Sequence, residues 1–284
     1  MGMTYECFRV ERRDRVAHVV MCRPEKRNSM IAAFWSELPQ IIESLDQEGT
    51  VRAVVLSAEG PHFTGGMDLS VFAGMGASSN DAQGRIQKPV AFLNLVRTLQ
   101  NSFSCLEACR MPVLAAIQGG CIGGGVDLAT ACDMRYATKD AYLTIHETNI
   151  GMTADVGTFP RLLNLIPEGF VRELAYTGRR IGAEEAHTIG LVNKVFETQE
   201  AMLDHVLGLA QEIAKKAPLA VYGCKKMITH ARDHSTADAL DYVGLWNASM
   251  LHAEQIMEAM TANMEKREGA FVDLPPIRMP FDQK

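Results

Sequence analysis

A glycine-rich stretch that carries one acidic residue is the part of this sequence best suited to chemistry. It follows the apolar run 113–117 and holds five glycines within seven residues: Gly119, Gly120, Gly123, Gly124 and Gly125. Glycines at the start of a helix let a ligand approach bare backbone N–H groups, where the helix dipole favours negative charge. Asp127 follows among apolar neighbours that predict burial of its carboxyl group. The stretch therefore predicts a turn that binds negative charge beside a buried acid.

The two common glycine-rich nucleotide motifs do not fit this turn. A phosphate-binding P-loop ends in Gly-Lys-Ser or Gly-Lys-Thr, whereas this turn ends in Gly125-Val126-Asp127. The dinucleotide fingerprint G-x-G-x-x-G also fails, because Leu128 stands where its third glycine belongs. A purely structural role, in which a tight turn packs a helix closely against a sheet, accounts for the glycines as well and stays open at this point.

The segment GGCIGGGVDLATACDMRY, residues 119–136, resembles the central segment of the enoyl-CoA hydratase/isomerase (crotonase) superfamily. The resemblance implies that the backbone N–H of Gly124 binds the thioester oxygen of an acyl-CoA and that Asp127 occupies the first acidic catalytic position. Hydratases of the family carry Glu at that position. Gly-Val-Asp-Leu instead resembles the branch of delta(3,5)-delta(2,4)-dienoyl-CoA isomerases.

A second glycine-bearing loop, Gly60–Leu69, directly follows the apolar run 51–57. It resembles the family's other signature loop, whose backbone N–H completes the oxyanion hole; by that match the second donor is Met67. The resemblance also assigns five residues to substrate or CoA binding: Gly65, Gly66, Asp68, Leu69 and Gly123. The loop is unspecific alone, but its order in the chain relative to the first glycine cluster matches the family.

Two further carboxylates complete the candidate site. Glu147 follows Asp127 by twenty residues, and the resemblance places it at the second acidic position, which hydratases share. Asp155 follows within Ala-Asp-Val-Gly-Thr, where hydratases usually carry a glycine-rich segment and dienoyl-CoA isomerases an aspartate. A single such carboxylate is more often an exposed loop residue or a helix cap. Three at matching positions favour catalysis by Asp127, Glu147 and Asp155.

The implied reaction converts 3,5-dienoyl-CoA to 2,4-dienoyl-CoA by shifting its two conjugated double bonds. A proton leaves carbon 2 and another is added at carbon 6, through a dienolate whose thioester oxygen two N–H donors stabilise. By analogy with hydratases, Glu147 serves carbon 2, Asp155 serves carbon 6 and Asp127 supports them. Burial and mutual repulsion raise carboxyl pKa values, so one member of the set can stay protonated near neutral pH. The reaction requires no metal, nicotinamide or flavin, and the coenzyme A thioester is the substrate.

Two other functions remain as alternatives. An enoyl-CoA hydratase would add water to a 2-enoyl-CoA with Asp127 and Glu147, and the presence of Asp155 counts against it. A non-catalytic crotonase-like binding protein is disfavoured by the intact acidic trio. A zinc-protease motif, suggested by His146-Glu147, fails because HExxH requires histidine at the position of Ile150.

The elements that must position these residues alternate between strands and helices. Short apolar runs predict strands at 8–10, 16–22, 51–57, 113–117 and 142–145. Helical spacing predicts helices at 30–45, with a kink or break at Pro39, and at 90–109 with Phe92 and Leu93 on its apolar face. The segment 74–89 is predicted to be a mobile loop over the acyl pocket. This order predicts an α/β fold, and the resemblance implies a crotonase-like spiral of ββα units.

The chain divides into a predicted core, residues 1–200 with the acyl-CoA site, and a helical region, residues 201–284. Helical patterns cover 201–217 and 236–264, and the second carries an apolar face with several methionines. Such a face more often serves packing or a subunit contact than ligand binding. The resemblance implies that this region forms trimers, commonly paired into hexamers, and covers the site.

Composition limits the partners and the cellular compartment that the protein can have. The chain has 284 residues, 47% of them apolar, and a formal net charge of −6, which argues against nucleic acid as the main partner. No apolar run approaches membrane-spanning length. The seven cysteines form no CxxC pair and the N-terminus resembles no signal peptide, so the expectation is a cytoplasmic protein with reduced thiols.

Overall fold

A twisted sheet of six strands forms the centre of the computed structural model, which describes residues 4–68, 70–71 and 82–277. The strands are β1 (Phe8–Arg13), β2 (Val16–Met21), β3 (Ala53–Ala58), β4 (Val113–Ile117), β6 (Met134–Thr138) and β9 (Lys194–Phe196), and they neighbour one another in that order. β1 and β2 form an antiparallel hairpin, and every later pair is parallel. Parallel strands need helical crossovers, so the carboxyl ends of β3 and β4 lead into loops at one edge of the sheet.

A smaller sheet lies beyond that edge and contains the glycine-rich turn. Its strands are β5 (Gly120–Ile122), β7 (Tyr142–Thr144) and β8 (Ile181–Gly182), with β5 parallel to β7 and β7 antiparallel to β8. The loop after β3 also joins β5, through a parallel bridge between Thr64 and Cys121. The two glycine-bearing loops predicted from the sequence are therefore neighbours in space.

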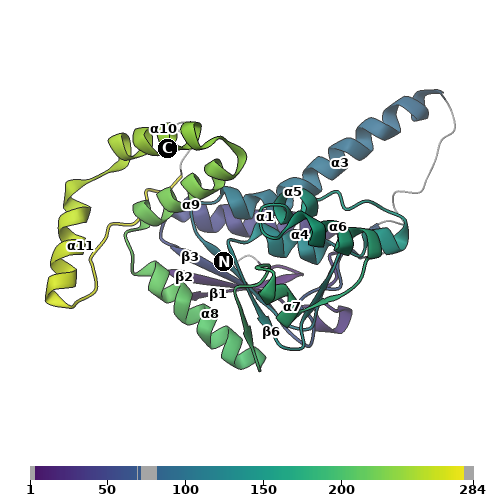
Figure 1. Ribbon diagram of the computed structural model, residues 1–284, viewed down its shortest axis with the longest axis horizontal. Coiled ribbons are helices and arrows are strands. Elements are labelled where there is room, and N and C mark those ends of the chain that lie inside the picture. The colour runs from purple at the N-terminus through teal and green to yellow at the C-terminus, as the bar shows by residue number, and fades with distance from the viewer. Residues whose placement is uncertain (1–3, 69, 72–81, 278–284) are drawn as a thin grey trace.

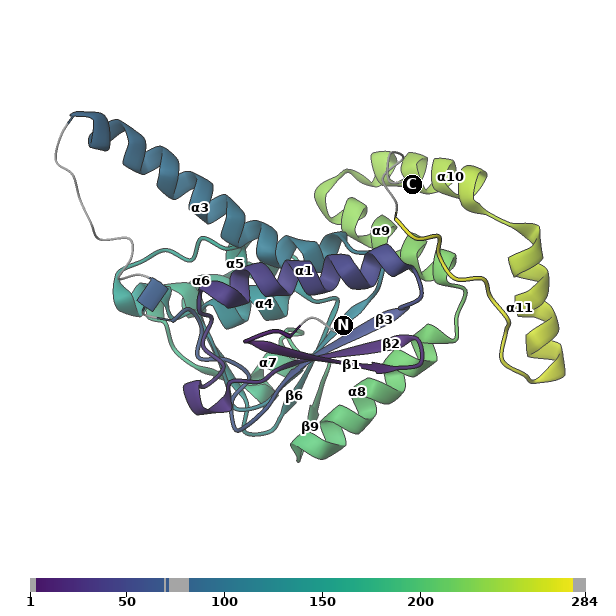
Figure 2. The same ribbon diagram turned by 180° about the vertical axis from the view of Figure 1, so that it is seen from behind.

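Helices cover both faces of the large sheet (Figures 1 and 2). On one face lie α1 (Ala32–Glu48), α3 (Ala82–Ala108) and α4 (Gly124–Ala131), and on the other lies α8 (Gln199–Ala214). Successive residues of a strand point to opposite faces. Accordingly Val54 and Leu56 pack in the core beneath α1, whereas Ala53 and Val55 pack against α8. Because α8 completes this second core, the beginning of the region 201–284 belongs to the same body as the sheet.

The remaining elements join or extend this body. Between the strands lie η1 (Pro24–Lys26), η2 (Glu147–Ile150), α5 (Thr158–Leu162), α6 (Glu168–Thr177) and α7 (Ala183–Thr188). The chain continues through α9 (Pro218–Asp233), α10 (Thr236–Met250) and α11 (Ala253–Glu265), and the last two extend away from the sheet (Figure 1). Within the described ranges, no helix is long and apolar enough to span a membrane.

The predicted break at Pro39 is wrong, because α1 runs without interruption through this residue. Proline has no N–H and therefore leaves the carbonyl group four residues earlier without its helical donor. That carbonyl belongs to Trp35, and it accepts a hydrogen bond from the hydroxyl of Ser102 on α3 at 2.8 Å. A neighbouring helix thus supplies the donor that proline lacks.

The expectations for α3 and α9 also need correction. Residues 82–89 of the predicted loop are helical, and residues 74–81 lie outside the described part of the chain. Phe92 and Leu93 are about half exposed, because the first half of α3 projects from the body, whereas Leu99, Phe103 and Leu106 in its second half are buried in the core (Figure 2). The sequence patterns also missed α9, and the predicted helix 236–264 is divided into α10 and α11 at Leu251 and His252.

Candidate active site

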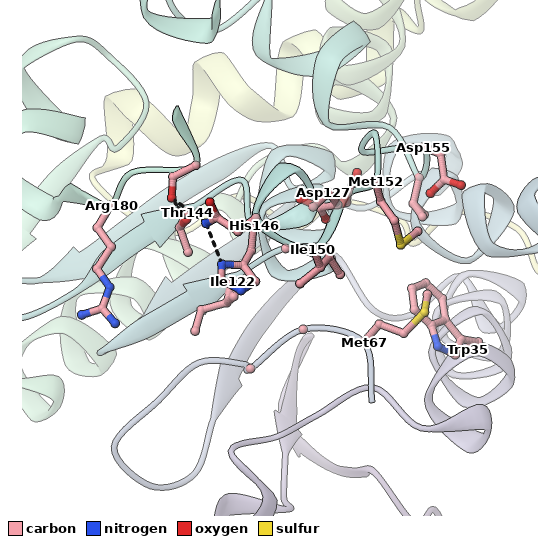
Figure 3. Close-up of a pocket in the computed structure, with 18 residues that line it drawn as sticks. Trp35, Met67, Ile122, Asp127, Thr144, His146, Ile150, Met152, Asp155 and Arg180 are labelled. Atoms are coloured by element: carbon pink, nitrogen blue, oxygen red, sulfur yellow. Dashed lines mark hydrogen bonds between the residues drawn. The ribbon is translucent and has the colours of Figure 1, made fainter. Parts of the chain in front are cut away.

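A cavity of about 530 Å³ lies between the small sheet and α1, and all three predicted catalytic carboxyl groups line it (Figure 3). We call it the carboxylate cavity and define it by Asp127, Glu147 and Asp155. Asp127 comes from α4, Glu147 begins η2, and Asp155 lies in the loop before α5. Gly65, Gly66, Met67, Gly123 and Gly124 line the same cavity. Residues far apart in the sequence therefore surround one space of the size typical for ligand sites.

The loop that carries Met67 is fixed by backbone hydrogen bonds on both sides. Met30 donates to the carbonyl of Gly66 at 2.8 Å, and Asp68 donates to the carbonyl of Met30 at 3.1 Å. Gly66 has a φ of +84°, and a Cβ at this position would lie 2.6 Å from the carbonyl oxygen of Ile122. Only glycine permits this close approach, which brings the Met67 amide next to the glycine-rich turn.

The turn itself presents the first residue of α4 to the cavity. Gly123 has a φ of +53°, and its N–H donates to the carbonyl of Thr144 at 3.0 Å. Gly124 follows as the first helical residue, where backbone N–H groups have no partner within the helix. Among the hydrogen bonds of the described residues, none uses the N–H of Met67 or of Gly124. Two backbone donors are therefore free to bind an oxygen with developing negative charge.

Asp127 is the most deeply buried of the three acids. Its side chain is 1% exposed, and its Oδ1 accepts the backbone N–H of Thr158 at 2.6 Å. Burial raises the pKa of Asp127 to about 7, while the hydrogen bond from Thr158 opposes this shift and the nearby Glu147 adds to it. Near neutral pH this carboxyl group consequently exists in both protonation states.

Glu147 and Asp155 also titrate above their ordinary range. Burial raises the pKa of Glu147, and repulsion by Asp155 raises it further. The Oε2 of Glu147 is fully buried and has no hydrogen-bond partner among the described residues. Burial likewise raises the pKa of Asp155. Because Glu147 acts on Asp127 and Asp155 acts on Glu147, the carboxyl groups titrate as a coupled set, and such a set can hold an acid and a base at the same pH.

The Asp155 loop is held from behind by α3 and α5. Gln100 on α3 donates to the backbone carbonyl of Asp155 at 2.7 Å. Arg161 on α5 donates to the carbonyl of Val156 at 3.3 Å. A Cβ on Gly157 would overlap the guanidinium of Arg161, so this position also requires glycine. These contacts fix the position of the Asp155 backbone relative to α3.

One of the predicted substrate-binding residues, Asp68, does not line the cavity. Asp68 is directed elsewhere: its Oδ2 accepts from Ser29 at 2.7 Å, and its Oδ1 accepts from the backbone and hydroxyl of Ser70 at 3.0 and 2.6 Å. These hydrogen bonds lower the pKa of Asp68 to about 2. Asp68 therefore stabilises its own turn, and Leu69 lies outside the described residues.

Several lining residues were not identified from the sequence, among them Trp35, Ile150, Met152 and Arg180. Trp35 lies in the apolar pattern of α1, which does not distinguish a cavity wall from the core. Arg180 lies at one end of the cavity (Figure 3), and its guanidinium lies 4.2 Å from the centre of the Tyr142 ring in a cation–π contact. No group of three His, Cys, Asp or Glu side chains among the described residues is arranged to hold a metal ion.

Comparison with known proteins identifies the family. The sequence profile described as enoyl-CoA hydratase/isomerase matches residues 11–274. The chain belongs to this family. Among relatives of the enoyl-CoA hydratase/isomerase family, a Mus musculus protein named mitochondrial Delta(3,5)-Delta(2,4)-dienoyl-CoA isomerase is 44% identical over 93% of this chain and 81% of its own length. An Arabidopsis thaliana protein named as the peroxisomal isomerase is 38% identical over 95% of this chain and 98% of its own length.

Solved structures of the family confirm the expected crotonase-like α/β fold. A crystal structure described as an enoyl-CoA hydratase from Bacillus anthracis matches with a TM-score of 0.83 and 30% identity, over 94% of this chain and 99% of that one. The expectation of a cytoplasmic protein is wrong, since the isomerases of the family cited above are named as mitochondrial or peroxisomal proteins. Free thiols argue only against an oxidising compartment, so they cannot separate the cytoplasm from other reducing compartments.

Proposed function

We propose that this protein is a dienoyl-CoA isomerase, which converts 3,5-dienoyl-CoA to 2,4-dienoyl-CoA in fatty-acid β-oxidation. The observation that carries the proposal is a third carboxyl group, Asp155, on the wall of a cavity that already holds Asp127 and Glu147. Relatives named as this isomerase, 36 to 44% identical over more than nine tenths of the chain, support it. The coenzyme A thioester is the substrate, and the proposed steps need no further cofactor.

The free N–H groups of Met67 and Gly124 form the proposed oxyanion hole. When a proton leaves carbon 2, negative charge develops on the thioester oxygen, and a donor aimed at that oxygen stabilises the transition state by roughly 3 to 4 kcal/mol. Gly65, Gly66 and Gly123 keep the walls next to these donors free of side chains. A thioester carbonyl can therefore reach both amides.

The structure supports the assignment of Glu147 to carbon 2 and Asp155 to carbon 6. A Cβ on Gly123 would lie only 3.1 Å from the Oε1 of Glu147, so this carboxyl group is adjacent to the turn that carries the Gly124 donor. Carbon 2 is bonded to the thioester carbonyl and must lie near that donor. Asp155 lies farther along the cavity, beside Met152 (Figure 3), where carbon 6 of an extended acyl chain would reach.

The proposed reaction needs no acid or base other than Glu147, Asp155 and the water that restores their protonation states between turnovers. The Glu147 carboxylate accepts a proton from carbon 2, and the electron pair of that C–H bond enters the conjugated dienolate. The protonated Asp155 then donates its proton to carbon 6, and the carbonyl re-forms as the double bonds settle at carbons 2 and 4. Asp127 is buried near Glu147 and accepts the Thr158 N–H, so it would position both Glu147 and the loop that carries Asp155.

The deciding experiment compares two substrates by ultraviolet absorbance. We expect the purified protein to change the conjugation of 3,5-dienoyl-CoA, and we expect the isosteric Asp155→Asn variant to lose this activity by about two to four orders of magnitude, the usual contribution of a general acid or base. Any residual hydration of 2-enoyl-CoA should persist in the variant. A wild-type protein that only hydrates 2-enoyl-CoA, or an Asp155→Asn variant that isomerises normally, would refute the proposal.

We further propose that residues 1–200 supply the catalytic core and that residues 201–284 assemble the protein into a homotrimer or a hexamer. Large apolar side chains of α10 and α11 support this, since they are more than half exposed in a single copy: Leu240, Leu245, Met257, Met260 and Met264. Along the described chain, the last residue that lines the carboxylate cavity is Arg180. If the C-terminal region covers the site, a neighbouring copy must provide that cover.

A further inference from the structure

Asp155 borders a second cavity on the far side of its loop. This cavity has a volume of about 380 Å³ and lies among α3, α5 and the end of α9. We call it the polar cavity, because charged and polar side chains dominate its walls: Gln100, Ser104, Glu107, Arg161, Arg232 and Asp233. Of the three acidic residues assigned to catalysis, only Asp155 lines both this cavity and the carboxylate cavity.

A hydrogen-bonded network keeps the walls of the polar cavity in place. Arg161 donates to Glu107 at 2.7 Å and to the hydroxyl of Ser104 at 3.1 Å. Arg232, at the end of α9, donates to the other oxygen of Glu107 at 2.8 Å. Each of these groups retains further donor or acceptor capacity. The volume far exceeds the roughly 10 to 15 Å³ that one water needs, so the cavity can hold several waters with polar partners.

The polar cavity faces solvent, whereas Asp127 and one carboxyl oxygen of Glu147 are buried. The side chain of Arg232 is 28% exposed and that of Asp233 is 62% exposed, and both stand at its rim. In contrast, the Oε2 of Glu147 is fully buried and Asp127 is 1% exposed. An acyl chain in the carboxylate cavity would exclude water from Glu147 but would not occupy the space behind Asp155.

We infer that Asp155 exchanges its proton with solvent through the polar cavity while the substrate is bound, and that Glu147 does not. This inference rests on the proposed isomerase function and goes beyond it, because it assigns a water route to one carboxyl group. When Asp155 takes a proton from carbon 6 of 2,4-dienoyl-CoA, the electron pair enters the dienolate. Asp155 then exchanges that proton for one from cavity water and returns the new proton to carbon 6.

The test is an isotope exchange measured separately at the two ends of the diene. The protein is incubated with 2,4-dienoyl-CoA in D₂O, and in a parallel reaction with 3,5-dienoyl-CoA. The starting compound is recovered at low conversion and analysed by mass spectrometry and NMR. We expect deuterium at carbon 6 of recovered 2,4-dienoyl-CoA, severalfold in excess of net conversion. We expect none above the uncatalysed background at carbon 2 of recovered 3,5-dienoyl-CoA.

Matched variants test whether the polar cavity is the route. Ser104→Met places an apolar side chain in the cavity, and Asp233→Trp covers its rim from an exposed position that tolerates substitution. Each should lower carbon 6 exchange severalfold relative to the isomerisation rate, whereas Ser104→Ala and Asp233→Ala should preserve that ratio. Thermal unfolding verifies that each variant is folded. If Ser104→Met does not fold, Asp233→Trp still tests the route.

Two results would overturn the inference while leaving the proposed function intact. The first is isomerisation with equal exchange, or with none, at carbons 2 and 6 in the unaltered protein. The second is an unchanged ratio of exchange to isomerisation in a folded variant with a filled or covered cavity. A protein that does not isomerise 3,5-dienoyl-CoA at all would instead refute the proposed function.

Discussion

The carboxyl group of Asp127 connects the two ends of the candidate site at the scale of single residues. Burial raises its pKa and the nearby Glu147 adds to that shift, while Asp127 accepts the N–H of Thr158, which follows the Asp155 loop. A buried carboxylate is unfavourable when charged, so the folded protein binds the proton of Asp127 more tightly than the unfolded chain does. This single residue should therefore make the stability of the protein depend on pH.

We predict that Asp127→Asn removes part of that dependence. With a folded-state pKa of about 7 against an ordinary value of 3.8, wild-type stability should fall as pH rises from about 4 to 7 and then level off. Asparagine stays neutral and can still accept the Thr158 N–H. The free energy of unfolding of the variant relative to wild type should therefore increase by roughly 2 to 3 kcal/mol between about pH 5 and pH 8.

Urea unfolding at several pH values measures this difference. The exposed Asp140 supplies a control, since Asp140→Asn replaces a surface carboxyl group and should change the unfolding free energy by no more than about 0.5 kcal/mol. A constant difference between Asp127→Asn and wild type across this range would show that Asp127 is charged in the folded protein throughout.

At the scale of elements, α1 remains continuous because α3 compensates for its proline. The hydroxyl of Ser102 donates to the carbonyl of Trp35, which Pro39 leaves without a helical donor, and also approaches the carbonyl of Thr98 at 3.1 Å. Trp35 lines the carboxylate cavity, so this contact supports a wall of the site.

A double-mutant cycle tests this compensation. Ser102→Ala should destabilise the protein by about 1 to 3 kcal/mol, because it leaves a buried carbonyl without a partner. In a Pro39→Ala background, the new N–H can satisfy Trp35, so the same substitution should cost about 1 kcal/mol less. Ser36→Ala, on the exposed side of α1, serves as the control. Additive effects in denaturant unfolding would contradict the prediction.

The elements differ in how far the sequence predicts them. The buried strands β3 and β4 were predicted correctly because their apolar runs are short and lie between turn residues, whereas the buried β6 was not predicted. The continuous α1 could not be predicted, because the donor from Ser102 lies 67 residues away from Trp35. Residues 82–89 of α3 were predicted as loop, and Phe92 and Leu93 were predicted to lie on a packed face. Both predictions were wrong, because composition and helical spacing do not show where a helix projects away from the core.

The candidate site was likewise predicted only in part from the sequence. Local sequence predicted a glycine-rich turn with a buried acid at Asp127, which the structure contains. The grouping of Glu147 and Asp155 with it came from family resemblance, since no local pattern connects acids on separate elements. Trp35 and the polar cavity depend on side chains from distant helices, so only the three-dimensional arrangement reveals them.

For the whole molecule, the exposed apolar residues of α10 and α11 lead to a prediction about assembly. These helices extend from the sheet, and Leu245 and Met257 are 68% and 59% exposed in a single copy. Large exposed apolar side chains concentrated on two neighbouring helices of the chain favour an interface between proteins. A charge placed within such an interface loses its hydration without gaining a partner, so the double variant Leu245→Lys, Met257→Lys should dissociate the assembly.

Light scattering coupled to size-exclusion chromatography measures the outcome as molar mass. We expect three or six times the 31.2 kDa of one chain for the wild type and a single-chain mass for the double variant. Tyr176→Lys, at a 69% exposed position on α6, introduces a charge outside α10 and α11 and should keep the wild-type mass. If neighbouring copies cover the site, the double variant should also lose isomerase activity while retaining its helical circular dichroism. A wild-type monomer at micromolar concentration would contradict the proposed assembly.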